Sequence, residues 1–453
     1  MGLVISLIVT FWVGYLIVKK YKPQPVLFIG GMILMFAGVA LGVGKILPGK
    51  TASTGLMLFD AYEFIKATFS SRAAGLGLNI MAVGGFAKYM DHIGASRALV
   101  KMTIKPLLRL KSPYVVLAAC WVLGMFLGLC INSASGLAML LMVTMFPVLI
   151  SLGVSRLSAT AAIATTLCLD WSPSDTGTIL SATTAGLDPV LYWTNYQVPI
   201  AMLVIPVVAV LHFVVQKWMD KRDGHVVKPI ELEKVEESDT TPGFYAILPT
   251  IPLALILAFS NLWITWIKMD IIKAMFIGVT LGMIFEYMRL RDGKKVFTDL
   301  QVFFDGLGMQ MANVITLIVA GETFARGLVV IGTIDSIIGS AQSSGFGGAG
   351  MILVMIAIIA ISSVVMGSGN APFFAFAALT PTVAAKMGLH PVVMLLPMHF
   401  AASAARTMSP ITAVIVVAAG MANISPFDLV KRTAIPMAGA LLMIVIGNFI
   451  LFY

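Results

Sequence analysis

The stretch SPITAVIVVAAGMANISPFDLVKRTAIP, from Ser409 to Pro436, has a counterpart 237 residues earlier, SPSDTGTILSATTAGLDPVLYWTNYQVP, from Ser172 to Pro199. Both stretches open with Ser-Pro and carry three prolines at spacings of 16 and 10 residues. Two more blocks repeat at nearly the same offset: FAKYMDHIG (86–94) matches FARGLVVIG (324–332), and NSASGLAMLLMVTMFP (132–147) lines up with MGSGNAPFFAFAALTP (366–381). Three matches in one order predict an internal duplication, which is common in transporters.

The composition is that of a membrane protein. Hydrophobic residues make up 59% of the 453 residues, charged residues 11%, and the mean hydropathy is +0.97. A soluble domain carries about 25% charged residues, and a helix needs about 20 apolar residues to span the hydrocarbon core. Recurring apolar runs therefore predict an all-α integral membrane protein with about 10–12 transmembrane helices. The three cysteines lie in apolar runs without metal-ligand spacing, so neither a metal site nor a disulfide framework is predicted.

The formal net charge of +9 reflects membrane topology rather than nucleic-acid binding. When the loops are assigned to alternate sides in chain order, 20 Lys and Arg residues fall on one side and 7 on the other. Because basic loops stay in the cytoplasm, the first side is predicted to be cytoplasmic. It includes the charged stretch 217–243, which divides the chain into an N-terminal repeat at 1–216 and a C-terminal repeat at 244–453.

The same assignment turns the two repeats in opposite directions across the membrane. The segment ending at Lys88 approaches a cytoplasmic loop, whereas its partner ending at Arg326 approaches an outside loop. Inverted repeats are typical of alternating-access carriers, so an inverted-repeat secondary transporter is predicted. Each repeat is expected to hold a re-entrant hairpin, at 112–150 and 349–386, and a broken helix, at 157–186 and 391–420. Two full spans in place of each hairpin fit the charge count equally well.

Helix-breaking residues gather at two equivalent places in each repeat. Non-helical backbone is tolerated at membrane depth only where protein buries it or where it lines a polar cavity. Half-helices that begin there offer free N–H groups and positive dipole ends to an anion, and a ligand with two carboxylates suits two related breaks. The unwound sites are predicted at 172–177 and 409–412. The predicted substrate-binding residues are Asn132, Ser133, Ser135, Gly136, Ser172, Ser174, Thr176, Ser368, Gly369, Asn370, Arg406, Ser409 and Thr412.

Ionisable residues inside apolar runs indicate function, because burying one costs at least about 2.5–3.5 kcal/mol. Arg406 lies just before the second unwound site, and Asp170 and Asp175 lie at the first. In one hypothesis Arg406 holds a substrate carboxylate in its guanidinium fork, and Asp170 or Asp175 couples a proton or a cation. In the other, Arg406 and Asp170 form a static bridge between the repeats.

Three further ionisable residues lie in the C-terminal repeat. His399, about two helical turns before Arg406, is a candidate for ion coupling. Glu322 and Arg326, four residues apart on one helix face, are expected to pair with each other.

Four stretches resemble the anaerobic C4-dicarboxylate uptake (DcuC) family. They are SSVVMGSGNAPFFAFAALTP (362–381), MSPITAVIVVAAGMANISPFDLVKRTAIPMA (408–438), RAAGLGLNIMAVGGFAKYMDHIGASRALVKM (72–102) and ASGLAMLLMVTMFPVLISLGVSRLSA (134–159). The GSGNAPF and SPFxxVKRTxIP blocks are specific to this family, and the likeness runs nearly from end to end. Within the family, the DcuD-type branch is the most similar.

This resemblance implies a secondary carrier of the bacterial inner membrane. Its substrates would be succinate, fumarate, malate and aspartate, moved by cation-coupled symport, exchange or efflux. The resemblance also implies the ion-transporter superfamily, whose members are homodimers in the lipid bilayer with an elevator-like transport domain. No cofactor is implied beyond sodium or proton coupling. The alternative is a cation-coupled exchanger for another small carboxylate, or a sodium/proton antiporter of the same superfamily.

Two other function classes fit the sequence less well. The chain contains no H-E-x-x-H, no G-x-G-D pair and no Ser with a suitable His base, so it is predicted not to be an enzyme. A channel also interrupts its helices, but four symmetric breaks in inverted orientation favour a carrier.

Overall fold

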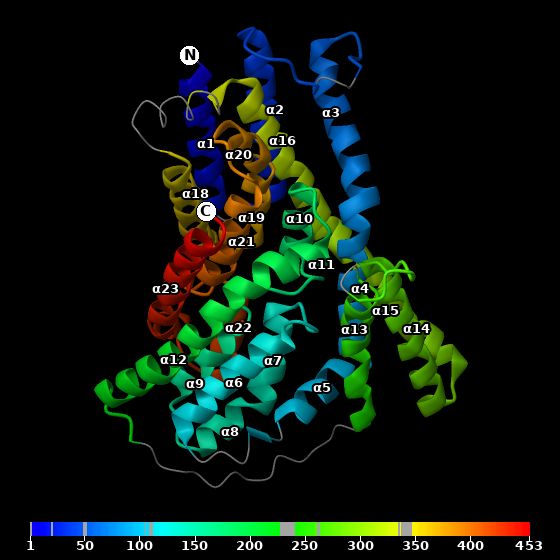
Figure 1. Cartoon of the computed structure of the whole chain (residues 1–453), viewed down its shortest axis with the longest axis vertical. Helices are drawn as coiled ribbons and strands as arrows, with labels where there is room; N and C mark the ends of the chain where they lie inside the picture. The colour runs from blue at the N-terminus through cyan, green and yellow to red at the C-terminus, as the bar shows by residue number, and fades with distance from the viewer. Residues whose placement is uncertain are drawn as a thin grey trace.

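The computed structural model describes residues 2–19, 21–48, 52–104, 106–107, 112–226, 241–260, 263–333, 336 and 347–453, and every regular element in these ranges is a helix (Figure 1). Six of the helices are long and apolar enough to cross a membrane, and six shorter apolar helices accompany them. The predicted all-α membrane fold is confirmed. Most of the predicted linker, residues 227–240, lies outside the described residues.

The first half of the chain consists of membrane helices, a hairpin, a broken helix and a long last helix that leads to the linker. Its first helices are α1 (Gly2–Val18) and α2 (Pro23–Ala40). An uninterrupted helix follows, made of α3 (Met57–Arg72), the π-helix η1 (Ala73–Gly77) and α4 (Leu78–His92), and then α5 (Ala95–Ile104). A hairpin follows, made of α6 (Pro113–Leu127), α7 (Ala134–Thr144) and α8 (Phe146–Ser151). The broken helix is α9 (Arg156–Ala164) and α10 (Thr176–Thr184), and the last helix is α11 (Pro189–Tyr192), the π-helix η3 (Trp193–Gln197) and α12 (Val198–Arg222).

The second half has the same order of elements among the described residues, apart from a counterpart of α5, whose position falls largely outside them. It begins with η4 (Gly243–Thr250), α13 (Ile251–Ala258) and α14 (Ile271–Leu290), then an uninterrupted helix of α15 (Gly293–Gln310), the π-helix η5 (Met311–Ile315) and α16 (Thr316–Val330). The second hairpin is α18 (Gly348–Met366), α19 (Asn370–Ala377) and α20 (Thr380–Lys386). The second broken helix is α21 (Val392–Arg406) and α22 (Ala413–Ala422), and α23 (Pro426–Leu451) ends the chain.

Two backbone features recur at the offset of the sequence repeat. The π-helices η1 and η5 begin 238 residues apart, the same offset as the FAKYMDHIG and FARGLVVIG blocks, and they contact each other. π-Helices are uncommon and occur mostly as single turns inside α-helices. Pro189 and Pro426, from the two proline triplets, both occupy the first turn of a helix, where a missing N–H is tolerated. The two halves therefore share local conformation as well as order.

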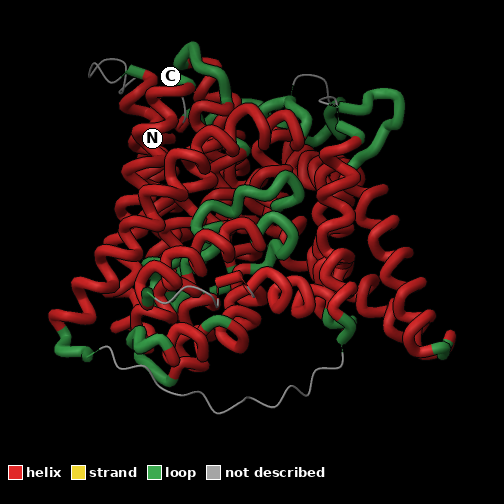
Figure 2. Tube along the Cα trace, turned by 60° about the horizontal axis from the view of Figure 1, so that its bottom comes forward, coloured by secondary structure: helices red, strands yellow, loops and turns green. Residues whose placement is uncertain are grey.

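The two hairpins open toward opposite ends of the molecule. In Figure 1, α8 of the first hairpin lies at the lower end and α20 of the second lies at the upper end. Their tips, residues 128–133 and 367–369, end inside the molecule beside the broken helices, where Figure 2 shows loop segments enclosed by helices. The opposite orientation of the two hairpins is that of an inverted repeat. Because α18 alone is long enough to cross a membrane, the choice between re-entrant hairpins and full spans stays a prediction.

The helices pack in two bundles, each built from both halves of the chain. In the first bundle, formed by α1–α5 and η4–α16, α16 packs on α2 and α15 on α4. In the second bundle, formed by α6–α12 and α18–α23, α12 packs on α23 and α18 on α21. The hairpins and the broken helices all belong to the second bundle. The main contact between the bundles is that of α16 with α19.

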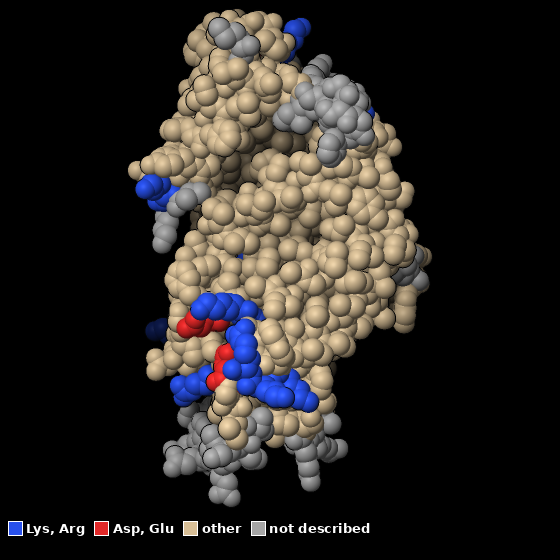
Figure 3. Space-filling view, turned by 90° about the vertical axis from the view of Figure 1, so that its left-hand side faces the viewer, with Lys and Arg blue, Asp and Glu red and all other residues tan. Residues whose placement is uncertain are grey.

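Charged side chains are concentrated away from the middle of the molecule. On the face shown in Figure 3, Lys and Arg gather near the lower end, and the broad middle zone is almost entirely uncharged. Exposed large apolar residues such as Phe11 (76%), Trp266 (81%) and Ile450 (73%) occur in several helices and loops. An uncharged apolar zone between charged ends fits a multi-span protein embedded in a bilayer.

A buried ion pair holds the lower end of the second bundle together. Arg432, from the stretch SPFDLVKRTAIP, lies 2.7 Å from Asp220 of α12, and the two side chains are 2% and 1% exposed. The Asp220 carboxylate also accepts hydrogen bonds from the hydroxyls of Tyr114 (2.9 Å), Ser155 (2.6 Å) and Ser158 (2.8 Å). This cluster joins the base of the first hairpin, both halves of the chain and the end of α12.

We expect Asp220→Asn to destabilise the protein strongly, by about 3–5 kcal/mol, because it removes the fully buried carboxylate that pairs with Arg432 and leaves only the more exposed Asp223 as counter-ion. The matched control is Asp428→Asn, which removes an exposed Asp428–Lys431 ion pair from the same helix, α23 and should cost about 1 kcal/mol or less. Thermal unfolding of both variants in detergent measures the difference. Equal melting temperatures would contradict a stabilising role for the cluster.

Candidate substrate site

The first hairpin tip is bonded to the first broken helix. Asn132 Nδ2 donates to Ser174 Oγ at 2.9 Å, and Ser172 Oγ donates to the Leu129 carbonyl at 2.9 Å. Ser133 caps the N-terminus of α7, its Oγ accepting from the Gly136 N–H at 3.2 Å. Ser135 and Gly136 therefore lie in the first turn of α7 rather than in the tip.

The first unwound segment covers residues 165–175, which differs from the predicted 172–177. It starts earlier because hydrogen bonds to the first hairpin replace helical ones. The indole N–H of Trp121 in α6 donates to the Thr165 carbonyl of the unwound segment at 3.2 Å, and the indole N–H of Trp171 in that segment donates to the Met125 carbonyl of α6 at 3.0 Å. It ends earlier because Asp175 caps α10 and accepts from the N–H groups of Gly177 (2.7 Å) and Thr178 (3.1 Å). Thr176 and Gly177 are consequently helical.

The second hairpin tip packs on the second broken helix. Gly367 ends α18 at a φ of +65°, and a side chain at Gly369 would lie 2.7 Å from the carbonyl oxygen of Ala402. Ser368 is half-buried, and Asn370 is exposed at the start of α19. The unwound segment covers residues 407–412, in which Thr412 Oγ1 bonds to the Arg406 carbonyl and buried Ser409 Oγ has no hydrogen-bond partner among the described residues.

Arg406 and Asp170 connect the two broken helices. One Nη of Arg406 lies 2.7 and 2.9 Å from the two oxygens of Asp170 and donates to the Leu167 carbonyl at 3.1 Å. Ser403 Oγ adds a hydrogen bond to Asp170 at 2.8 Å. The bridge between the repeats is therefore present, with side chains only 12% and 9% exposed. Arg406 Nε is buried and has no partner among the described residues, so part of the guanidinium fork is unused.

A second polar group lies beside this bridge. Nε2 of His399 is 3.3 Å from Asp175, and its Nδ1 is 3.4 Å from the side-chain nitrogen of Gln197. Phe373 of the second hairpin stacks on the His399 ring at 5.1 Å. Two of the three ion-coupling candidates, Asp175 and His399, are thus in contact, and the third, Asp170, lies on the same unwound segment.

Sequence reasoning missed two residues of this polar group. Gln197 is buried and also bonds to Thr178, and Ser403 is buried on the face of α21 that meets Asp170. Both had a usable signal. Gln197 lies two residues before Pro199, the third proline of its triplet, and Ser403 is three residues before Arg406, which places it on the same helix face.

The expected pair of Glu322 and Arg326 is wrong. Glu322 pairs instead with Arg72 of α3 at 2.6 Å, and Arg326 donates to the backbone carbonyls of Lys45 (2.9 Å) and Ile46 (2.6 Å). A partner 250 residues away in the chain replaces the local one because α16 packs against α3.

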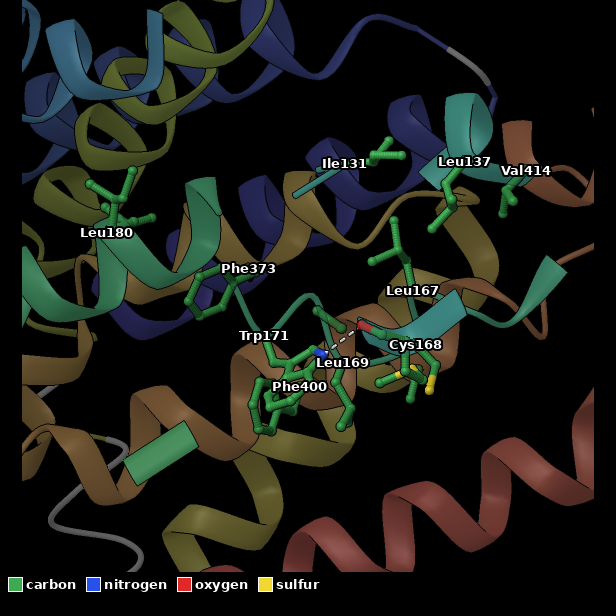
Figure 4. Packing of buried hydrophobic residues seen from close by; sticks show 14 of the residues in the cluster. Ile131, Leu137, Leu167, Cys168, Leu169, Trp171, Leu180, Phe373, Phe400 and Val414 are labelled. Atoms are coloured by element: carbon green, nitrogen blue, oxygen red, sulfur yellow. Dashed lines mark hydrogen bonds between the residues drawn. The ribbon is translucent and has the colours of Figure 1, made fainter. Parts of the chain in front are cut away.

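The place where both tips and both unwound segments meet, residues 128–133, 165–175, 367–369 and 407–412, is called the junction below. Figure 4 shows apolar side chains from this region, among them Ile131 of the first tip, Leu167 of the first unwound segment, Phe373 of α19 and Val414 of α22. A cavity of only about 10 Å³ borders Asn132 and Ser174. That space holds about one water molecule, so the junction has to open before an organic anion can enter.

The tight packing of the junction explains why residue 177 is a glycine. A side chain at Gly177 would collide with the His399 ring, which burial and Phe373 hold in place. We expect Gly177→Ala to lower transport at least about tenfold, because overpacking here displaces His399. Gly420→Ala in α22, where an added Cβ meets no atom within 4 Å, is the control and should retain activity. Equal initial rates for the two variants would contradict this packing.

The whole chain, residues 1–453, matches the model of one protein family, DcuC: C4-dicarboxylate anaerobic carrier. The chain belongs to the DcuC family. A relative from Vibrio cholerae serotype O1, named probable anaerobic C4-dicarboxylate transporter DcuC, is 37% identical over 99% of this chain and 97% of its own. Anaerobic C4-dicarboxylate transporter DcuC from Escherichia coli K12 is 36% identical over 98% and 96%. The closer likeness to the DcuD-type branch stays a prediction.

Two solved transporter structures share the fold of this DcuC family member. The Alcanivorax borkumensis YdaH transporter has a TM-score of 0.63 at 16% identity, covering 94% of this chain and 98% of its own. MtrF of Neisseria gonorrhoeae has a TM-score of 0.63 at 14% identity, covering 95% of each chain. At these identities the likeness concerns the fold alone. Together with the family, it confirms the predicted membrane transport fold, and the naming of the relatives as transporters confirms transport rather than catalysis.

Proposed function

We propose that the protein carries C4-dicarboxylates such as succinate, fumarate, malate and aspartate across the bacterial inner membrane, with the linker 217–243 on the cytoplasmic side. The family and the names of its relatives support the substrate class. The observation that carries the proposal is the junction, where broken backbone from both halves surrounds the buried Arg406. A dianion needs this kind of site, because it has to exchange hydration for fixed donors inside the membrane.

The donors for a carboxylate come from side chains and from helix ends. Helices α7, α10, α19 and α22 all begin at the junction, so the positive ends of their dipoles lie there. Ser133 and Asp175 already accept hydrogen bonds from first-turn N–H groups of α7 and α10. Three buried polar atoms at the same place have no partner among the described residues: Arg406 Nε, Ser409 Oγ and Asn132 Oδ1. Buried groups of this kind are normally hydrogen-bonded, so we assign Arg406 and Ser409 to the substrate.

Coupling is assigned to the acidic residues of the first unwound segment. Asp170 and Asp175 supply two negative charges against the single positive charge of Arg406, and a proton on His399 would balance the remaining one. A sodium ion held by Asp175 and freed backbone carbonyls would do the same. Removing sodium at constant pH therefore distinguishes the two coupling ions: transport continues if the ion is a proton and stops if it is sodium.

The division into two bundles supports elevator-like alternating access. The second bundle holds both hairpins and the whole junction, and it contacts the first chiefly through α16 and α19. We propose that the second bundle moves across the membrane with the substrate, and that the first bundle forms a homodimer and stays fixed. Because the junction is closed in the structure, the hairpins also open at one stage of the cycle.

Counterflow of labelled succinate into liposomes that contain the purified protein tests this function. We expect accumulation of label that saturates, competes with fumarate, malate and aspartate, and is absent from protein-free vesicles. Omitting sodium at fixed pH separates the two coupling ions. If another small carboxylate, or sodium/proton exchange without dicarboxylate, is the only activity, the proposed substrate class is wrong.

A further inference from the structure

A second cavity lies in the first bundle, away from the junction. It measures about 220 Å³, more than twenty times the space beside Asn132, and lies between α3 and α16. Its polar lining consists of Arg72, Glu322, Ser71 and Thr68, and Phe64 and Pro48 contribute apolar surface. The Arg72 Nε donates to Glu322 at 2.6 Å, with side chains 28% and 13% exposed. Glu322 lies in a helix that is long and apolar enough to cross a membrane, and an ionisable residue in such a helix marks a functional site by default.

The fold itself does not require this ion pair. With the offset of 238 that relates η1 to η5, the counterpart of Arg72 is Gln310, and the counterpart of Glu322 is Gly84. Gln310 and Gly84 also meet, and the glutamine side chain fills the space that a Cβ on Gly84 would occupy. The same helix crossing therefore occurs twice. At Gly84 and Gln310 it is uncharged and tightly packed, and at Arg72 and Glu322 it is charged and borders a cavity, so the crossing itself does not need the two charges.

The backbone around the cavity supports the same conclusion. Residues 43–48, after α2, run without helical structure along α16, and Arg326 satisfies the carbonyls of Lys45 and Ile46 there. These two hydrogen bonds hold the segment in place beside the cavity. This segment brings Pro48 to the cavity and closes it on one side.

The cavity also adjoins the moving bundle. Gly321, next to Glu322, packs so closely on α19 that a Cβ there would lie 2.8 Å from the Cα of Ala375. On the other side, α10 contacts η1, which follows Arg72 directly. The charged pair is thus placed where the first bundle meets the second hairpin and the first broken helix.

We propose that this cavity is a second dicarboxylate-binding subsite, in which a substrate carboxylate takes the place of Glu322 on Arg72. Ser71 and Thr68 supply hydroxyl donors to the bound group. The subsite lies along the second half of α3, below the upper end of the molecule where that helix begins, and substrate enters it from that upper end only. The inference rests on the proposed dicarboxylate transport. Glu322 competes with the substrate for the Arg72 guanidinium. This competition decides whether a substitution at either residue raises or lowers the KM for succinate.

The test compares Arg72→Gln with Glu322→Gln in sealed membrane vesicles of both orientations. We expect Arg72→Gln to raise the KM for succinate about tenfold from the upper side, because a charge-assisted hydrogen bond is lost. We expect Glu322→Gln to lower that KM, because Arg72 is released from its internal partner. Neither variant should change the KM from the opposite side. If the ion pair is purely structural, both variants should be impaired in transport, and their KM values should not change in opposite directions.

The double variant Arg72→Gln/Glu322→Gln removes both charges, so that this crossing is uncharged like that of Gln310 and Gly84. It leaves no unpaired Glu322, and it therefore tests the subsite even if Arg72→Gln alone does not fold. We expect it to insert normally and to keep the raised KM. Gln310→Ala is the control and should leave the KM from the upper side unchanged. A wild-type KM in the double variant, or an unchanged KM in both single variants, as expected if lipid fills the cavity, would overturn the subsite. If the unaltered protein moves no succinate at all, the proposed function fails instead.

Discussion

Arg406→Lys is expected to reduce succinate transport by about a hundredfold or more while the protein still folds and inserts. In the structure, one nitrogen of Arg406 already serves Asp170 and the Leu167 carbonyl, and its Nε has no partner among the described residues. A guanidinium can hold Asp170 with one edge and a substrate carboxylate with the other, whereas an ammonium is a single point charge. Lysine therefore keeps the charge and the bridge but loses the second binding edge.

The control for this variant is Arg222→Lys, which makes the same substitution in an exposed ion pair with Asp223 and should leave transport unchanged. Initial rates in liposomes and the melting temperature separate the two roles of Arg406. If Arg406→Lys transports nearly as well as the unaltered protein, the static bridge is its whole role.

Asp170→Asn is expected to show a larger stabilisation by succinate than the unaltered protein. Removing the carboxylate leaves Arg406 buried without a counter-ion, at a cost of about 3–5 kcal/mol. A dicarboxylate that binds Arg406 supplies the missing negative charge, so it recovers part of that loss in addition to the ordinary stabilisation by a ligand. Melting temperatures with and without succinate, for both proteins, measure the effect.

Asp220→Asn is the matched control for this experiment. It also removes a carboxylate partner of a buried arginine, Arg432, which keeps Asp223 as a second partner. It should be destabilised and gain no more from succinate than the unaltered protein does. An equal succinate response in Asp170→Asn and Asp220→Asn would mean that Arg406 does not contact the substrate.

The fold was predictable because its signals are local and repeated. The first two prolines of each triplet mark where helices begin: Pro173 and Pro410 precede α10 and α22, and Pro189 and Pro426 begin α11 and α23. The Gly-Ser-rich stretches mark the hairpin tips. Each signal acts through the backbone of its own segment, since prolines and glycines limit where a helix can continue. Equal spacing in the two halves then revealed the symmetry.

Features that depend on contacts between distant segments were not predictable. The first unwound segment begins at Thr165 within an apolar stretch, where the Trp121 indole from the hairpin provides the hydrogen bond that replaces helix. Glu322 pairs with Arg72 rather than with Arg326, because helix packing decided against the local i,i+4 rule. Of the candidate site residues, Ser135, Gly136 and Thr176 became helical because the caps Ser133 and Asp175 begin their helices earlier than the residue pattern suggested.

A structure of the protein determined with bound succinate tests the central claim most directly. We predict succinate at the junction, with one carboxylate within hydrogen-bond distance of Arg406 Nε and close to Ser409. Density for succinate only elsewhere, for example beside Arg72 and Glu322 with the junction still closed, would contradict the claim that broken backbone from the two halves forms the transport site.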